Sequence, residues 1–307
     1  MKKSFIITID TESDNQWDYT HSQSIENVHF IPRFQSLCEK YNFKPVYLVD
    51  YSMAQSQELI DFLNNRLAAG NCEVGMHLHA WDTPPSHEYD IIPESRSYLI
   101  EYPMDVMEEK IATMSSLLRN SFSSPITSHR AGRWATDERY LSLLAKYGYK
   151  VDCSYTPGIN WSSSKGAING GSDYSSVISS AKWLSGDLLE VPMTVSKLHC
   201  IDDFKIKELP KEIIKGALGR NVWLRPALSS NKLMNCLVKS NVNDYLEFMM
   251  HSSELMPGGS PYFISEADIE RMYSRLEDFF SEVSKEYAGC TLQEYYDLKW
   301  SEKEGKE

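Results

Sequence analysis

Two histidines that stand two residues apart, His77 and His79, are the side chains of this sequence best suited to binding a metal. They close an apolar run, residues 72–79, that is typical of a β-strand. Because side chains alternate between the two faces of a strand, residues i and i+2 point the same way. Imidazole is the commonest nitrogen ligand of zinc and similar divalent metals. A metal needs at least a third ligand, and a carboxylate elsewhere in the chain must supply it.

Polar residues also follow other apolar runs, at points where strands are expected to end. If these ends meet at one edge, they bring carboxylates, an arginine and a third histidine to the histidine pair. That inventory suits metal-assisted hydrolysis, in which the metal polarises a carbonyl and activates water, a carboxylate takes a proton and a histidine protonates the leaving group. The candidate residues are Asp10, Glu12, His77, His79, Arg130, Asp152 and His251.

Short apolar runs alternate with helical patterns along the chain, which is typical of βα units. The predicted strands are 4–10, 45–51, 72–79, 126–130, 149–154, 188–195 and 245–251. The predicted helices are 25–41, 57–69, 103–122, 136–147 and 265–287. This order predicts either a barrel or an open doubly wound sheet, and in both the functional sites lie beyond the carboxyl ends of the strands.

The chain shows no internal repeat and no break in composition. We therefore expect a single domain over residues 1–300, with an insertion at about 197–244 and a charged tail at 301–307. The 307 residues carry 43 acidic against 31 basic side chains, a net charge of −12. That balance argues against a nucleic-acid partner or an anionic membrane partner, both of which need a basic surface.

The sequence pattern predicts no targeting signal. The apolar run that follows Lys2 and Lys3 is too short for a signal peptide. No apolar stretch approaches the roughly 20 residues of a membrane span. The cysteines form no C-x-x-C pair and are expected to be free thiols, which together with the other signs predicts a cytoplasmic protein. They are Cys38, Cys72, Cys153, Cys200, Cys236 and Cys290.

Five ordered motifs, spread over most of the chain, resemble those of the polysaccharide deacetylases, also called NodB-homology or carbohydrate esterase family 4 proteins. The motifs are Thr8-Ile9-Asp10-Thr11-Glu12, Glu73-Val74-Gly75-Met76-His77, Arg130-Ala131-Gly132-Arg133-Trp134, Asp152-Cys153-Ser154 with Pro157, and Met249-Met250-His251. The resemblance implies an α/β fold, a distorted (β/α)7 barrel. It also implies hydrolysis of an acetamide on a sugar.

The resemblance assigns a role to each matching residue. Asp10 matches the family's general base and His251 its general acid. Arg130 matches the arginine that orients the base, and Asp152 matches an acid that supports the catalytic arrangement. His77 matches the first histidine ligand of the metal, which is expected to be zinc, with cobalt or nickel as alternatives.

Two positions depart from the family pattern. Thr11 stands where the family has a metal-binding aspartate, and Trp81 stands where it has a second histidine. Glu12, with its longer reach, and His79 are the expected replacements. Asp10 and Glu12 share a face of the strand, as do His77 and His79. The two departures form either one compensated metal site or a site that is lost or altered.

The sequence supports one main hypothesis and two alternatives. The first is a metal-dependent hydrolase that removes an acetyl group from an N-acetylated sugar of a glycan or, in the cytoplasm, of a nucleotide- or lipid-linked precursor. The alternatives are a metal-free or divergent C–N hydrolase on the same scaffold, and a non-catalytic carbohydrate-binding module. Loops 82–102 and 158–183 would shape the sugar pocket. Tryptophans near the predicted rim either stack on sugar or only cover the barrel end; they are Trp17, Trp81, Trp134 and Trp161.

Overall fold

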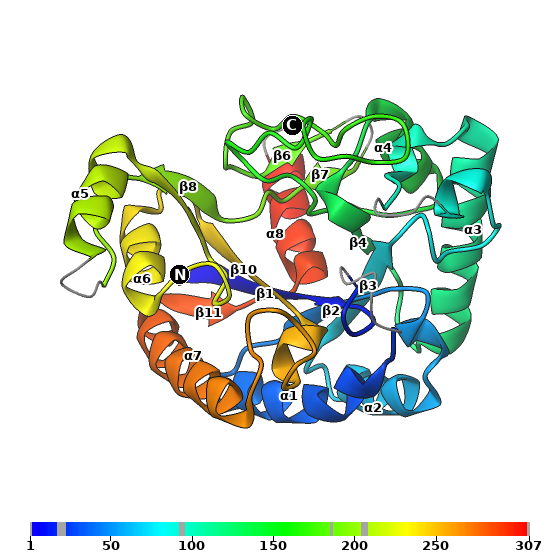
Figure 1. The fold of residues 1–307 in the computed structure, drawn as a ribbon. Coiled ribbons are helices and arrows are strands. Elements are labelled where there is room, and N and C mark those ends of the chain that lie inside the picture. Colours follow the sequence, from blue (N-terminus) through cyan, green and yellow to red (C-terminus); the bar gives the residue numbers. More distant parts are fainter. Residues whose placement is uncertain (1, 17–22, 92–95, 185–186, 204–207, 306–307) are drawn as a thin grey trace.

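A strongly curled, mostly parallel sheet forms the centre of the molecule, and helices cover its outer face (Figure 1). The computed structural model describes residues 2–16, 23–91, 96–184, 187–203 and 208–305. Within these residues the strands of the main sheet follow the order β10-β1-β2-β3-β4-β5-β7-β6, and β11 also pairs with β1. The curled sheet closes about half of a barrel. The predicted α/β fold with a distorted barrel is therefore confirmed.

The strands of the main sheet are short, and most are fully buried. They are β1 (Lys3–Thr11), β2 (Pro45–Val49), β3 (Glu73–Leu78), β4 (Ser128–Ala131), β5 (Val151–Asp152), β6 (Lys182–Trp183), β7 (Leu189–Glu190), β10 (Tyr245–His251) and β11 (Tyr287–Gly289). A separate antiparallel pair consists of β8 (Val195–Leu198) and β9 (Arg220–Trp223). Parallel strands that are covered on both faces carry near-continuous apolar runs, which explains the patterns of β2 and β10.

The longer helices return the chain between strands, and side-chain caps begin several of them. They are α1 (Ile31–Lys40), α2 (Gln57–Ala68), α3 (Met104–Ser121), α4 (Glu138–Lys146), α5 (Leu209–Leu218), α6 (Asn231–Ser240), α7 (Glu266–Glu286) and α8 (Leu292–Glu304). Ser265 and Asp268 form a capping box at the start of α7. Among the described residues, no helix has the length and apolar content of a membrane span.

Strand register brings the predicted site residues to one edge of the sheet. β1 pairs with β10 so that Asp10 lies beside His251, and β3 pairs with β4 so that His77 lies beside Arg130. All of these pairings are parallel, so the carboxyl ends of the strands lie together. The prediction that the polar strand ends come together is therefore confirmed for these four residues.

The sequence missed several elements after residue 180. The predicted strand 188–195 is wrong as one element, because β7 ends at Glu190 and the chain leaves the main sheet near Pro192 to form β8. Proline has no N–H to continue a ladder. The predicted insertion, 197–244, contains β9, α5 and α6. α8 runs through Glu304, so the first residues of the predicted tail are helical.

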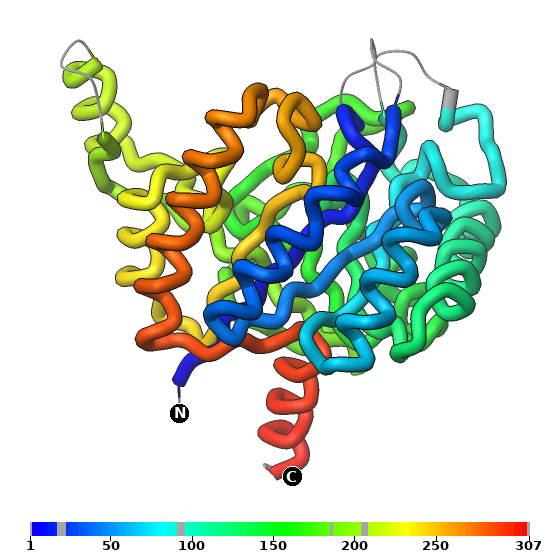
Figure 2. The backbone as a smooth tube through the Cα atoms, turned by 90° about the horizontal axis from the view of Figure 1, so that it is seen from below, coloured from blue at the N-terminus to red at the C-terminus, as the bar shows by residue number. Residues whose placement is uncertain are grey.

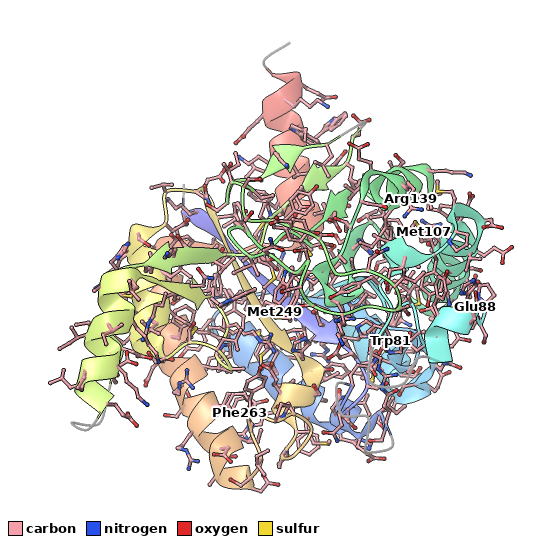
Figure 3. The ribbon with its side chains drawn as sticks, turned by 45° about the horizontal axis from the view of Figure 1, so that its top comes forward. Trp81, Glu88, Met107, Arg139, Met249 and Phe263 are labelled. Atoms are coloured by element: carbon pink, nitrogen blue, oxygen red, sulfur yellow. The ribbon has the colours of Figure 1, made fainter. Side chains whose placement is uncertain are left out.

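Side chains from β8, β9 and β10 form a small cluster beside the main core. Met249 lies near the centre of Figure 3 and packs with Met193, Val195 and Trp223. Trp134 and Trp161 pack against this cluster from two loops. The insertion is therefore joined to the mouth of the half-barrel by apolar contacts.

Candidate metal and catalytic site

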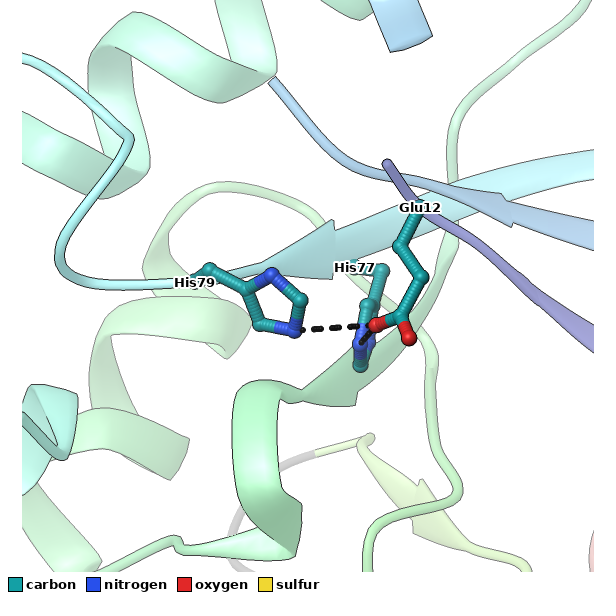
Figure 4. A group of neighbouring side chains, drawn as sticks. All are labelled: Glu12, His77 and His79. Carbon is teal, nitrogen blue, oxygen red and sulfur yellow. Dashed lines mark ion pairs between the residues drawn. The ribbon is translucent and has the colours of Figure 1, made fainter. Parts of the chain in front are cut away.

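Glu12, His77 and His79 converge at the carboxyl ends of β1 and β3 (Figure 4). Glu12 Oε2 lies 3.6 Å from His77 Nε2 and 3.3 Å from His79 Nε2. All three side chains are buried, and each offers one ligand atom within 4.8 Å of the others. The structure thus brings together the three residues that the sequence predicts as metal ligands.

The chemistry of this group fits a divalent metal. Glu12 Oε2 is buried and accepts no hydrogen bond from the described part of the chain. His77 Nδ1 lies 3.0 Å from the carbonyl oxygen of Arg130, which can only accept a hydrogen bond, so Nδ1 carries the proton. That tautomer leaves the lone pair of Nε2 facing Glu12. Two imidazoles and one carboxylate are a common protein ligand set for catalytic zinc.

The surroundings of the two imidazoles differ. Burial lowers the pKa of His77, but the negative charges of Asp10 and Glu12 outweigh burial and raise that pKa to about 9. Burial, with the positive charges of His77 and His251, holds the pKa of His79 well below its usual value. His79 is therefore a neutral imidazole, the form that binds metals. The negative field that favours a proton on His77 would equally favour a metal cation.

Trp81, one of the two departures from the motif pattern, packs directly on the candidate ligand His79. The Trp81 ring stacks on His79 with centroids 4.4 Å apart and an angle of 15°. The side-chain amide of Gln16 lies 2.8 Å from His79 Nδ1. The departure at Trp81 is thus coupled to His79 by direct contact.

Asp10 is held by Arg130 at one carboxylate oxygen. Arg130 Nη1 donates to Asp10 Oδ1 over 2.6 Å, and its Nη2 atom contacts Glu247 and Thr8. Asp10 Oδ2 faces His77 Nε2 at 3.9 Å and His251 Nε2 at 3.7 Å. Burial would raise the pKa of Asp10, but the charges of Arg130 and the two histidines outweigh it and lower that pKa. Asp10 is therefore a carboxylate that can accept a proton.

His251, the last residue of β10, contacts two charged side chains through its Nδ1 atom. Its Nδ1 atom lies 3.1 Å from Glu254 Oε1 and 2.7 Å from Arg225 Nη2. Arg225 also pairs with Glu254, and both side chains are buried. The pKa of Glu254 is lowered because Arg225 and His251 outweigh the effect of burial. Sequence reasoning did not assign Glu254 a role and missed Arg225, which lies in the insertion without a motif around it.

Asp152 belongs to a neighbouring buried cluster. Its Oδ1 atom accepts hydrogen bonds from His129 Nδ1 and from Ser154 Oγ, each over 2.7 Å. His129 Nε2 in turn lies 2.7 Å from the hydroxyl of Tyr140. His129 thus joins Asp152 to Tyr140 within the buried interior. A part for Asp152 in catalysis stays a prediction.

A second group able to hold a metal shares His79 with the first. It consists of Asp50, His79 and Asp82. Asp50 directly follows β2, so the rule that strand ends carry the chemistry could have found it. Asp82 Oδ2 lies 4.0 Å from His79 Nδ1. The first group is fully buried and contains His77, which matches the motif resemblance, whereas Asp82 is partly exposed.

Asp82→Asn is expected to change the pH dependence of stability. Burial raises the pKa of Asp82 to about 7. A carboxyl group that binds its proton more tightly when folded loses stabilisation as the pH rises from its unfolded pKa through its folded pKa. Urea unfolding with a chelator present should therefore show the variant gaining more stability at about pH 8 than at about pH 5. Equal effects at both pH values would contradict this.

A large pocket opens directly onto the candidate site. Its volume is about 910 Å³, and its lining includes Glu12, Arg225, His251 and Glu254. Aromatic side chains from loops complete the walls: Tyr98, Trp134, Trp161 and Tyr262. The rings of Trp134 and Trp161 are stacked, with centroids 5.3 Å apart. Two of the predicted tryptophans thus line the pocket, while Trp17 lies outside the described residues.

Comparison with solved structures identifies the fold. No protein-family model matches the sequence, and no curated protein matches it. A Mycobacterium smegmatis protein assigned as a polysaccharide deacetylase superposes with a TM-score of 0.56 and 14% identity, over 99% of this chain and 92% of that one. The chain has the polysaccharide deacetylase fold. The resemblance read from the sequence motifs is therefore confirmed at the level of the fold.

A second solved structure also has a similar fold. The 4-α-glucanotransferase of Thermococcus litoralis matches with a TM-score of 0.54 and 10% identity. The match covers 97% of this chain and 40% of that chain. The polysaccharide deacetylase fold of this chain is therefore similar to part of a larger protein with a different named activity, and function must be argued from the site.

Proposed function

We propose that this protein is a metal-dependent hydrolase that removes an acetyl group from an N-acetylated sugar of a glycan or glycan precursor. The observation that carries the proposal is the placement of Asp10 and His251 beside the Glu12, His77 and His79 group. Asp10 Oδ2 lies within 3.9 Å of His77 Nε2 and within 3.7 Å of His251 Nε2. A candidate base, a candidate acid and a metal ligand set therefore surround one point.

Each side chain has a distinct task in this proposal. A zinc ion, or cobalt or nickel, held by Glu12, His77 and His79 would polarise the amide carbonyl and activate water. Asp10 Oδ2 accepts a proton from the attacking water, while Arg130 fixes the other oxygen of Asp10. His251 Nε2 delivers a proton to the leaving amine.

The pocket supports a carbohydrate substrate. Its aromatic walls offer flat apolar faces to the C–H faces of sugar rings. The names of both structural neighbours refer to action on carbohydrates. The volume of about 910 Å³ suits a ligand larger than one sugar ring.

Acetate release tests the proposal. The protein, loaded with zinc, cobalt or nickel in turn, is incubated with N-acetylated oligosaccharides and nucleotide-linked N-acetyl sugars. Metal-dependent release of acetate that a chelator abolishes is expected. Acetate release that survives complete metal removal would instead support the divergent C–N hydrolase. Sugar binding without any acetate release would support the non-catalytic alternative.

Glu254→Gln is expected to lower kcat by at least about tenfold with little change in KM, because the amide no longer orients His251 with a charge. Glu73→Gln is the matched control, since it also converts a buried carboxylate to an amide, at the amino end of β3. It should leave kcat per folded molecule nearly unchanged but cost about 1–3 kcal/mol of unfolding free energy, because it weakens the hydrogen bonds from Ser128 and from the backbone of Gln293. Steady-state kinetics and urea unfolding measure both effects. An equal loss of kcat in the two variants would contradict the supporting role of Glu254.

A further inference from the structure

Helix α5 has an unusual distribution of apolar and charged side chains. Its large apolar residues Leu209, Ile213, Ile214 and Leu218 are all exposed, with exposed fractions of 38% to 69%. Its acidic residue Glu212 is buried. In a helix that packs on a globular core the apolar side faces inward. The solvent-facing side of α5 is therefore the apolar side.

The inward side of α5 is committed to the β8–β9 pair. Glu212 accepts a hydrogen bond from Arg220 of β9 over 2.5 Å. Gly216 is buried, and a side chain there would meet Ile201. These contacts on one side fix the orientation of α5. The apolar residues are therefore exposed because of how the helix packs.

Two exposed lysines, Lys211 and Lys215, lie beside the apolar face, and the exposed acid Glu208 directly precedes the helix. The other acid of α5, Glu212, is buried and shared between Arg220 and Lys215. Lys197 of β8 is also exposed. An apolar helix face bordered by lysines is the composition of helices that lie in the surface of a bilayer. Its charge is complementary to anionic lipid headgroups.

The position of α5 relates it to the candidate site. In Figure 2, β1 starts and α8 ends at one edge of the molecule, and α5 projects at the opposite edge. β1 and β10 finish at the same edge as α5. The segment that follows β10 lies at this edge and supplies Tyr262 and Ile264 to the pocket lining. Both of these side chains are also exposed, at 46% and 63%. Apolar side chains therefore project from α5 and from the pocket lip at one edge.

We propose that the exposed face of α5, formed by Leu209, Ile213, Ile214 and Leu218, docks this protein onto the surface of an anionic lipid bilayer. Docking there turns the pocket mouth towards the membrane. This inference goes beyond the proposed function and does not depend on it. Combined with that function, it points to a sugar attached to a lipid as the substrate.

The net charge of −12 opposes binding of the surface as a whole to anionic lipid. The attraction must therefore come from the local apolar face and its lysines. Because interactions between charges are screened beyond about 8–10 Å at physiological salt, the face in contact with the headgroups determines the interaction. Interfacial helices need only an apolar face with polar borders, without a shaped partner surface.

Vesicle co-sedimentation of the full chain tests the docking. Vesicles of phosphatidylcholine alone are compared with vesicles that contain about one third phosphatidylglycerol. Binding to the anionic vesicles is expected, and the double variant Ile213→Asp/Ile214→Asp should weaken it by at least about tenfold. Lys211→Glu should reduce the preference for anionic vesicles. The control is Val242→Asp, an equally drastic change at a side chain that is 90% exposed and lies just before β10, at the opposite edge.

Either of two outcomes would overturn the proposal. One is that the parent chain fails to bind vesicles, and the other is that Val242→Asp weakens vesicle binding as much as the double variant does. A concentration-dependent dimer that the double variant abolishes, together with absence of vesicle binding, would assign the face to a second copy of this chain. Thermal unfolding of each variant verifies that it is folded. Because no step requires turnover, these outcomes are independent of whether acetate is released.

Discussion

Asp10→Asn is expected to lower kcat by about 10²–10⁴-fold, the usual contribution of a positioned proton acceptor. Asparagine keeps the shape of the side chain and still offers an oxygen to Arg130, which now donates to Asp10 Oδ1 over 2.6 Å. It cannot accept a proton from water. The expected signature is therefore loss of turnover with little change in substrate binding or in bound metal.

Acetate release and metal content, measured on the same preparation, verify this expectation. Thr11→Ala is the matched control, because Thr11 is the next residue and its hydroxyl donates to the carbonyl of Ile9. The control should turn over at nearly the parent rate. If Asp10→Asn instead lost its metal while Thr11→Ala did not, Asp10 would be a ligand and the base would have to be another group.

The central site could be predicted from the sequence because it depends on strand ends. Side chains at the end of a buried parallel strand have only one edge to occupy, so Asp10, His77 and His251 converge once the strands are identified. Glu12 and His79 follow from the two-residue repeat of a strand. The register that pairs Asp10 with His251 fixes the distance between them without any contribution from the loops.

The side chains that hold these site residues in place could not be predicted in the same way. Arg225 reaches Glu254 and His251 from an insertion whose path depends on the β8–β9 pair. Glu247 is an acid in the middle of β10, where an apolar side chain is expected, and its partner Arg130 comes from β4. Such contacts join segments more than a hundred residues apart or lie outside any repeat. Periodicity carries no information about them.

Trp81 shows a different limit of the sequence pattern. Read against the family motif, it marks the loss of a ligand. In the structure its ring covers His79 at 4.4 Å, and burial with nearby positive charge keeps that histidine neutral. The residue that departs from the motif thus supports the neighbouring imidazole, and only the relative position of the two rings reveals it.

Glu12→Gln is expected to weaken metal binding by more than about a hundredfold, since even the loss of an outer-shell partner costs 10–100-fold. The amide removes the negative charge that faces both imidazoles, at 3.6 Å from His77 and 3.3 Å from His79. Metal that binds only the folded protein raises the unfolding temperature in proportion to the logarithm of its concentration over Kd. Added zinc should therefore stabilise the parent chain and leave the variant nearly unaffected, which calorimetry and metal analysis can measure without a substrate.

Two companion variants determine which of the overlapping groups holds the metal. Asp50→Asn removes a ligand of the second group only, and His77→Ala removes a ligand of the first group only. If the metal lies with Glu12, then His77→Ala should abolish the stabilisation by zinc and Asp50→Asn should preserve it. The opposite result would move the metal to Asp50, His79 and Asp82. In that case Glu12 would become a free carboxylate 3.8 Å from His251, and a candidate base in place of Asp10.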